Sequence, residues 1–321
     1  SRPRPSFVRL ALAAALLVVL ASATRLAPPP AAGQPGPPLR WLKGNTHTHT
    51  TESDGDSSPD VVTRWYREHG YQFLVLSDHN VLTSIDALAA LHGKDSEFLL
   101  IKGEEVTDAF DGRPVHINGL DVAETVVPQK GSSLLDVLQR NVDEIRRVRG
   151  VPHVNHPNFR WAFSTEDLRQ VRNMRLLEIF NGHPHVNNLG GRGVPGLEQV
   201  WVVILSSGTL MHGIAVDDAH TFKQPGNPAV AGPGRGWVMV RAERLEARAI
   251  LQALEEGRFY ASTDVELSDY VAYRRAQSLP VRALEVELQS KRAFPFVSLV
   301  MMLLGLPFAF AIGKRGSLYG V

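Results

Sequence analysis

The chain has 321 residues, of which 44% are hydrophobic and 21% charged, and this ordinary globular composition excludes disorder of the whole chain. Lysine and arginine together number 34 and aspartate and glutamate 33, so charge gives no reason to expect a nucleic-acid partner. The chain has no cysteine, which excludes disulfides, thiolate catalysis and cysteine-ligated zinc sites.

The N-terminal segment has the pattern of a secretory signal. Three arginines precede an apolar run at residues 10–20, and small residues at 21–23 offer a cleavage site. We therefore expect a signal peptide over residues 1–23 and export to the periplasm or the extracellular space. The alternative is an uncleaved membrane anchor, although the run is shorter than the roughly 20 residues that span a bilayer. Residues 24–40 are rich in proline, alanine and glycine and are predicted to form a flexible linker.

Between residues 41 and 272, short apolar runs alternate with longer amphipathic stretches. The apolar runs predict strands at residues 73–76, 98–101, 115–117, 176–180, 201–205, 213–216 and 236–240. The amphipathic stretches predict helices at residues 58–69, 132–149 and 245–256. This alternation indicates an α/β domain with a mainly parallel sheet or barrel. Polar residues at the ends of many different runs favour a barrel, which places its active site at the carboxyl ends of its strands.

The composition changes after about Tyr273. Residues 293–312 carry no charge and are flanked by Lys291-Arg292 and Lys314-Arg315. We expect a transmembrane-like helix there, and through it association with a membrane. The alternative is a buried core helix.

His47 and His49 form a His-x-His pair. Side chains at positions i and i+2 of a strand face the same side, so both imidazoles can reach one metal ion. Taken alone, the pair could equally be two exposed histidines.

Further metal-binding residue types follow the predicted strands. They are Asp54, His79, Glu105, His156, Asp218 and His220. Imidazole and carboxylate groups are the common ligands of zinc, manganese and iron. Buried charged groups are costly unless they are paired or bind a metal, so a purely structural role for such a series is the weaker interpretation. The sequence therefore predicts a metal centre.

These motifs, in this order, resemble those of the polymerase-and-histidinol-phosphatase (PHP) superfamily over residues 41–268. The matching stretches are Gly44–Thr50, Ser53–Gly55, Ser77–Asn80, Gly103–Thr107, Asn155–Asn158 and Asp217–His220. Gly257–Ser262 resembles the closing segment of its CehA/McbA-like branch, named for a carbaryl hydrolase.

The resemblance implies a distorted seven-stranded (β/α) barrel that holds two or three divalent ions of zinc, manganese or iron. One ion would be bound by His47, His49, Glu105 and Asp218. A second would share Glu105 and also take His116 and His156. A third would be bound by Asp54, His79 and His220. Glu104 is the alternative to Glu105, but the Gly-x-Glu pattern of the family selects Glu105.

Such a site predicts a metal-dependent hydrolase that acts on a small-molecule ester. A water bound between two cations loses its proton more easily and can attack a phosphate ester, so a phosphoesterase is the first expectation. The alternatives are a carbamate or carboxylic ester hydrolase at the same site, and a non-catalytic metal-binding fusion.

Other polar residues are candidates for supporting roles. Asp78, Glu178 and Asn181 could orient the ligating imidazoles, or could simply cap local structure. His153, His183 and His185 are expected at the rim of the site, where one could transfer a proton. Arg160 or Arg192 could bind a phosphate, although a solvated arginine is the plainer interpretation.

The tail resembles a different family. Residues 278–316, including Pro295–Val300 and Leu306–Ala309, are similar to part of the lipopolysaccharide-export permeases of the LptF/LptG kind. Such a permease needs several membrane spans, so we do not expect this chain to be a transporter. The abrupt change near Tyr273 suggests a composite chain, and a membrane-tethered hydrolase is the biological alternative.

Overall fold

The computed structural model describes residues 38–93 and 97–264, with a few single residues between 271 and 289. The predicted signal peptide, most of the predicted linker and the transmembrane-like helix over residues 293–312 lie outside the described residues. Within the described part, no helix is both long and apolar enough to cross a bilayer.

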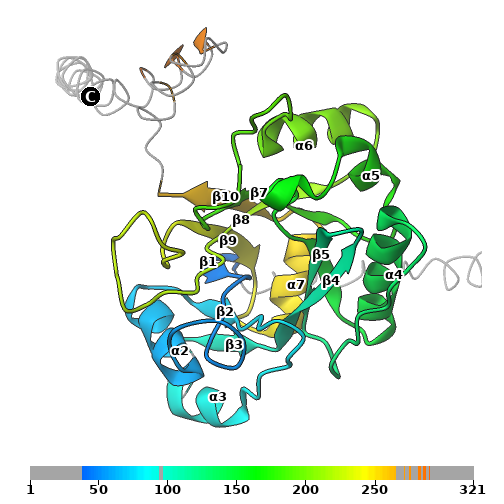
Figure 1. Ribbon diagram of the computed structural model, residues 1–321. Helices are drawn as coiled ribbons and strands as arrows, with labels where there is room; N and C mark the ends of the chain where they lie inside the picture. The colour runs from blue at the N-terminus through cyan, green and yellow to red at the C-terminus, as the bar shows by residue number, and fades with distance from the viewer. Residues whose placement is uncertain are drawn as a thin grey trace, which may run out of the picture. The chain divides into compact units, whose positions relative to one another are not determined.

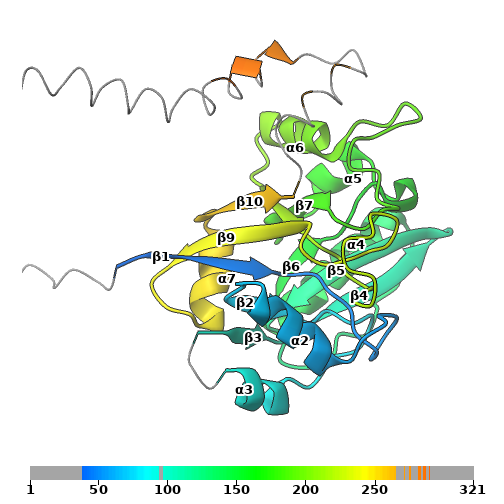
Figure 2. The same ribbon diagram turned by 90° about the vertical axis from the view of Figure 1, so that its left-hand side faces the viewer.

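The described residues contain two five-stranded sheets (Figures 1 and 2). The strands of the first sheet are β1 (Arg40–Asn45), β2 (Phe73–Val75), β3 (Leu99–Ile101), β9 (Gly236–Ala242) and β10 (Phe259–Thr263). Their order is β10-β9-β1-β2-β3, in which β1, β2 and β3 are parallel while β9 and β10 pair antiparallel. β1 points toward the viewer in Figure 1.

The second sheet follows the chain order. Its strands are β4 (Gly103–Phe110), β5 (Arg113–Leu120), β6 (Val151–Val154), β7 (Leu176–Asn181) and β8 (His212–Val216). β4, β5 and β6 pair antiparallel, whereas β6, β7 and β8 are parallel.

Most helices lie on the outside of the two sheets, whereas α7 packs in the core that joins them, which gives a mixed α/β fold (Figure 1). They are α2 (Pro59–Glu68), α3 (Asp86–His92), α4 (Leu134–Arg147), α5 (Thr165–Gln170), α6 (Leu197–Ser206) and α7 (Ala247–Glu255), with a 3-10 turn, η1, at Phe159–Trp161. α2 and α3 contact β2 and β3, α4 contacts β4 to β6, α6 contacts β7, and α7 contacts β9.

The described strands pair into two sheets and do not form the expected seven-stranded barrel. Two isolated parallel bridges, Thr48 to Ala219 and His79 to Glu105, join the two sheets, but they do not merge them into one closed barrel. The cause is antiparallel pairing at two places, in the β4-β5 hairpin and between β9 and β10, which α7 connects, and the apolar runs did not reveal it. The tight turn of the β4-β5 hairpin places Asp111 and Gly112 at φ of 49° and 74°, a geometry for which an Asp-Gly pair is well suited.

The strand predicted at residues 201–205 is wrong, because these residues lie in α6. Leu197, Val200 and Ile204 are buried, while Val202 and Val203 are exposed. This spacing of three and four is helical, but a short continuous apolar run does not separate a strand from a buried helix.

The three predicted helices are confirmed as α2, α4 and α7. The first two begin at serine caps, because the hydroxyl of Ser58 accepts from the amide of Val61 and that of Ser133 accepts from the amide of Asp136. Pro59 occupies the first helical position of α2, where its missing N–H has no partner to lose.

A central apolar core joins the two sheets and α7. It includes Leu42, Phe73, Ile101, Val151, Leu176, Ile214, Val238, Ile250 and Leu254. Separate clusters pack α4, α5 and α6 against the second sheet, and α2 and α3 against β2 and β3. Because these cores hold the strands from both sides, the carboxyl ends of β1, β2, β6 and β8 are presented together.

The close approach of β1 and β2 gives a test of this packing. A Cβ atom on Gly44 would lie 2.2 Å from the ring of Phe73, so we expect Gly44→Ala to lower the free energy of unfolding by about 2 kcal/mol. At Gly232 the nearest heavy atom would be 3.8 Å away, and Gly232→Ala should change stability little. Urea unfolding of both variants measures the difference, and equal stabilities would contradict this packing.

Candidate metal centre

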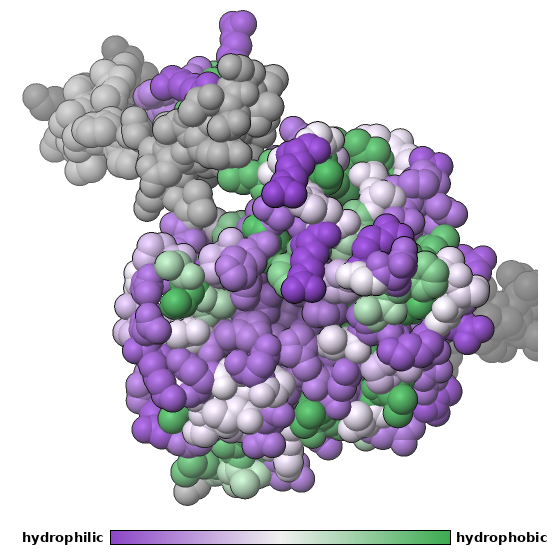
Figure 3. All heavy atoms as spheres, viewed as in Figure 1, coloured by the Kyte–Doolittle hydropathy of each residue, from purple (hydrophilic) through white to green (hydrophobic). Residues whose placement is uncertain are grey.

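Polar side chains gather where the strands end, on the face of the molecule whose centre is hydrophilic in Figure 3. All nine predicted ligands belong to groups of donors whose ligand atoms lie within 4.8 Å of one another. They are His47, His49, Asp54, His79, Glu105, His116, His156, Asp218 and His220. The structure thus brings together residues that are up to 173 positions apart in the chain.

The His-x-His pair converges on Asp218. Nε2 of His47 and Nε2 of His49 lie 3.1 Å apart, and each lies 3.1 Å from Oδ1 of Asp218. Glu105 completes the group, with carboxylate oxygens 3.6 Å from His47 and 3.5 Å from His49. These four residues are those that the family resemblance assigned to the first ion.

A second group of donors surrounds the other side of Glu105. Oε1 of Glu105 lies 3.1 Å from Nδ1 of His116 and 3.2 Å from Nε2 of His156. Nδ1 of His116 is buried but makes no hydrogen bond with any described residue. Nδ1 of His116 therefore faces Oε1 of Glu105 without a hydrogen bond between them. This arrangement is the one expected if both atoms bind the same cation.

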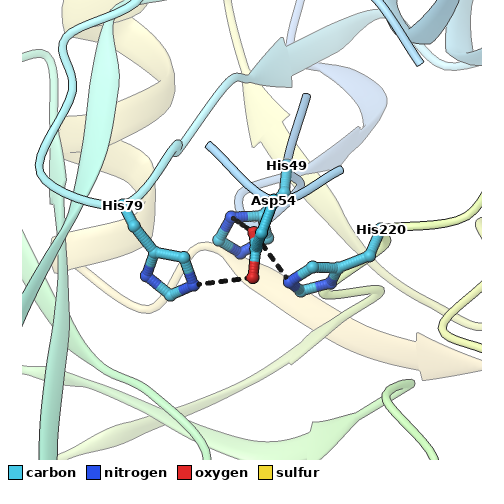
Figure 4. Close-up of side chains that lie close together, drawn as sticks. All are labelled: His49, Asp54, His79 and His220. Carbon is cyan, nitrogen blue, oxygen red and sulfur yellow. Dashed lines mark ion pairs between the residues drawn. The ribbon is translucent and has the colours of Figure 1, made fainter. Parts of the chain in front are cut away.

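The third group surrounds Asp54 (Figure 4). Its carboxylate oxygens lie 3.3 Å from Nε2 of His220, 3.5 Å from Nε2 of His79 and 3.6 Å from Nδ1 of His49. His49 and His79 also reach the other groups, because Nδ1 of His79 lies 2.9 Å from Glu105. The donors therefore form one continuous cluster rather than three separate sites.

The electrostatics of the cluster fit a divalent cation. Burial opposes the ionisation of Glu105 and Asp218, yet the surrounding imidazoles hold the pKa of both carboxyls well below the usual range. Burial also opposes the charge of His47, but Asp218 and Glu178 raise its pKa well above its usual value. Two buried carboxylates among imidazoles, with ligand atoms a few ångströms apart, match the nitrogen and oxygen ligands that zinc and manganese bind.

Glu178 and Asn181 support the cluster from behind, as predicted for residues that orient ligands. Oε1 of Glu178 lies 2.7 Å from Nδ1 of His47, and its Oε2 accepts from the backbone amide of His156. The side chain of Asn181 donates to Glu178 at 2.9 Å and to Asp218 at 3.1 Å. A bulge between Glu178 and Phe180 explains why residues three positions apart on β7 both face the cluster.

Asp78 does not touch a ligating imidazole through any hydrogen bond of the described residues. It accepts from the amide and hydroxyl of Thr50, and from the hydroxyls of Ser53 and Thr83. Asp78 therefore holds the turn that carries Asp54, which is a positioning role rather than proton transfer.

The histidines predicted at the rim divide into two kinds. His153 lies in β6 and is fully buried, so its placement at the rim is wrong. Every residue of β6 faces the interior, and burial lowers the pKa of His153 to about 4. His183 is half-buried and His185 exposed in the loop after β7, as expected for rim residues. Burial lowers the pKa of His183 to about 4, and its Nδ1 accepts from the amide of His185 at 3.1 Å.

Arg160 is exposed, and its guanidinium lies 5.7 Å from the ring centroid of Phe159. No described contact joins Arg160 to the cluster. Phe159 is the nearer residue, because its ring lies 5.2 Å from that of His156 and 6.3 Å from those of His116 and His183. The sequence analysis did not predict that Phe159 would lie at the site. Its position directly after the Asn-His-Pro-Asn motif could have indicated this.

Asp217 is a second residue that the sequence interpretation left without a role. It is fully buried and accepts from the amides of Gly234, Arg235 and Gly236 and from the hydroxyl of Tyr66. It therefore fixes the start of β9 beside Asp218. The paired carboxylates at positions 217 and 218 were the signal, because successive strand residues face opposite sides.

The contact between Glu178 and His47 gives a test of the cluster. Glu178→Gln removes the charge that orients His47, and we expect the affinity for Mn²⁺ or Zn²⁺ to fall by about 10- to 100-fold. Glu243→Gln makes the same chemical change at an exposed residue and should have no effect. Calorimetric titration of metal-stripped protein measures both affinities. Unchanged affinity in Glu178→Gln would contradict the assignment of this cluster as a metal centre.

Two sequence comparisons match parts of the chain. A family model for the lipopolysaccharide export system permease LptF/LptG matches residues 249–321, which confirms the permease-like resemblance of the tail. A protein of Haemophilus influenzae described as a 5'-3' exoribonuclease is 38% identical over 84 residues. These are 26% of this chain and 30% of that protein, so the match spans less than a third of the relative's length.

Solved structures are similar to this chain to different degrees. A two-domain protein of Bacteroides vulgatus, described as containing a predicted PHP-like metal-dependent phosphoesterase, has a TM-score of 0.53 and 21% identity, over 71% of this chain and 67% of that one. A lesion-specific endonuclease of Pyrococcus furiosus has a TM-score of 0.45 and 12% identity, over 69% and 58% of the two chains. The chain therefore shares the α/β fold of the PHP-like protein from Bacteroides vulgatus, as the resemblance of its motifs implied.

Proposed function

We propose that this chain is a metal-dependent hydrolase that cleaves phosphate esters. The observation that carries the proposal is the convergence of nine imidazole and carboxylate donors at the carboxyl ends of the strands. The fold supports it, because the similar protein of Bacteroides vulgatus is described as containing a PHP-like metal-dependent phosphoesterase.

Two or three divalent ions of zinc, manganese or iron would be bound by the nine donors, with Glu105 shared between two of them. Bound there, divalent cations supply Lewis-acid activation of water and of the ester's phosphoryl oxygen. Glu178 would keep His47 in a fixed orientation through the 2.7 Å contact with its Nδ1. Phe159 would exclude water from one side of the cluster, since its ring packs against His156.

Hydrolysis of two other classes of substrate remains as an alternative function. The CehA/McbA-like resemblance of Gly257–Ser262 favours a carbamate or carboxylic ester at the same donors. The Haemophilus influenzae relative favours a phosphodiester in RNA. The near-zero net charge supports a small-molecule substrate over a nucleic acid. A metal-binding fusion without activity is the third alternative.

The location of the enzyme is a separate proposal. The basic and apolar pattern of residues 1–23 supports export, and the uncharged stretch at residues 293–312 supports tethering to a membrane.

The proposed activity makes a direct prediction. Full-length protein loaded with Mn²⁺ or Zn²⁺ should hydrolyse 4-nitrophenyl phosphate. His47→Ala and Asp218→Asn should each lower kcat/KM by about a hundredfold or more, because each removes a direct ligand. Release of 4-nitrophenolate measures the rate. His69→Ala is the matched control, since this exposed imidazole stacks on Trp65, outside the cluster.

A panel of substrates separates the alternatives. We would compare 4-nitrophenyl phosphate with bis(4-nitrophenyl) phosphate, a naphthyl carbamate and a 5'-phosphorylated oligoribonucleotide. Faster cleavage of the carbamate than of any phosphate ester would overturn the phosphoesterase assignment. Full activity after treatment with a chelator would overturn the metal-dependent mechanism altogether.

A further inference from the structure

A pocket with a volume of about 440 Å³ opens beside the donor cluster. The end of β7 and the loop that follows it form one wall, and the segment between β8 and β9 forms the other. None of the nine candidate metal ligands lines it. Its size lies within the range of pockets that hold small organic ligands.

The pocket adjoins the cluster through two of its lining residues. Asn181 lines the pocket and also donates to Oδ2 of Asp218 at 3.1 Å. His183 lines the pocket as well, and its ring centroid lies 5.5 Å from that of His220. A molecule whose ester group reached the cluster could therefore extend its remaining part into this pocket.

Arg235 supplies the cation of the pocket. Its guanidinium donates to the carbonyl oxygens of Gly182 at 3.1 Å, Asn227 at 2.7 Å and Pro228 at 3.5 Å. Among the described residues, no carboxylate lies within ion-pair distance of this guanidinium. A guanidinium carries five N–H donors, so these three bonds leave two N–H groups for a ligand.

The surroundings of Arg235 favour an anion. Arg235 lies directly against the backbone that follows β7, because a Cβ on Gly182 would lie 2.9 Å from Cβ of Arg235. Two other ionisable residues line the pocket, His183 and Asp264. Nδ1 of His183 accepts from the amide of His185 at 3.1 Å, as a neutral imidazole does. The charge of Asp264 interacts with that of Arg235, but Asp264 is exposed, so solvent and salt screen this interaction.

Apolar side chains form part of the remaining wall, beside the amides of Asn181 and Asn188. The apolar residues are Phe180, Pro184, Val186, Pro228 and Pro233. Rigid apolar walls of this kind suit a planar or aliphatic organic group better than a free inorganic phosphate. The pocket therefore combines apolar walls with one cation, next to the proposed reaction site.

We propose that the pocket selects esters whose organic group carries a second anionic substituent, a carboxylate or a phosphate, and that Arg235 binds that substituent. This inference rests on the proposed function for the identity of the reacting bond. Arg235 acts on specificity: it holds the end of the substrate that does not react. The competing explanation is that Arg235 only ties the segment around Asn227 to Gly182 through carbonyl bonds.

The test compares three aryl phosphates, in which the para substituent is a carboxylate, a phosphate or a neutral carboxamide. In the wild-type protein we expect the two anionic substrates to have lower KM than the neutral one. Arg235→Gln should raise KM for the anionic substrates by about tenfold or more relative to the neutral substrate, with kcat less affected. For each protein we take the ratio of KM for an anionic substrate to KM for the neutral substrate. Comparing this ratio between the wild-type protein and the variant cancels differences in leaving-group reactivity. Comparing the two anionic substrates shows whether carboxylate or phosphate is preferred.

Controls separate recognition from folding. Arg241→Gln makes the same chemical change on β9 at an exposed residue outside the pocket, and should leave all three KM values unchanged. Arg235→Lys keeps the positive charge and should retain part of the preference for anionic substrates. Thermal unfolding of each variant confirms that the protein remains folded.

A binding measurement tests the role of Arg235 without depending on enzyme turnover. Calorimetric titration with 4-hydroxybenzoate should detect binding to the wild-type protein that weakens about tenfold in Arg235→Gln. If no aryl phosphate is cleaved by the wild-type protein, the proposed function fails, while this titration still decides the role of the pocket. An equal loss for neutral and anionic substrates, or unchanged binding of 4-hydroxybenzoate, would overturn the inference.

Discussion

The buried carboxylate of Glu105 is the interaction on which the site depends. Its two oxygens lie within 3.6 Å of nitrogens from five imidazoles, those of His47, His49, His79, His116 and His156. A carboxylate that is only 1% exposed is costly unless positive charge surrounds it. The neighbouring carboxylates raise the pKa of His47 well above its usual value against the effect of burial, so a protonated imidazole can supply part of this charge. Divalent cations held between these groups would also supply it.

Around this centre, buried acidic residues directly precede several of the proposed ligands in the sequence. Asp78, Glu104 and Asp217 each directly precede a proposed ligand, and each is buried. Beside His79 and Glu105 the chain is extended, so the ligand points into the cluster and its predecessor points into the protein body. Asp218 has a left-handed backbone with φ of 50°, and its side chain also reaches the cluster. Asp78 and Asp217 use that position to anchor backbone and hydroxyl groups of neighbouring loops. The acidic residues beside the ligands therefore set the position of the loops that form the site.

Both sheets contribute proposed ligands to the site. The first sheet contributes the His-x-His pair and His79, while the second contributes Glu105, His116, His156 and Asp218. Two bridges, Thr48 to Ala219 and His79 to Glu105, join the sheets where these residues meet. Because the pocket lined by Arg235 lies between the segments that follow β7 and β8, substrate choice is separated from the proposed metal ligands. Changes in those segments could alter specificity without altering the metal centre.

The amino-acid sequence identified the donors that converge, because ligand chemistry restricts residue type and because most of the donors follow a short apolar run, while the family resemblance assigned His116. It also predicted α2, α4 and α7, whose apolar spacing and caps are local features. Only the tertiary structure decided that residues 201–205 form part of α6, that β10 pairs antiparallel with β9 across the α7 connection, and that His153 is buried. It also placed Arg235 against Gly182, 53 positions away, beside the cluster. These features depend on pairing and packing between distant segments, and local spacing carries no information about such partners.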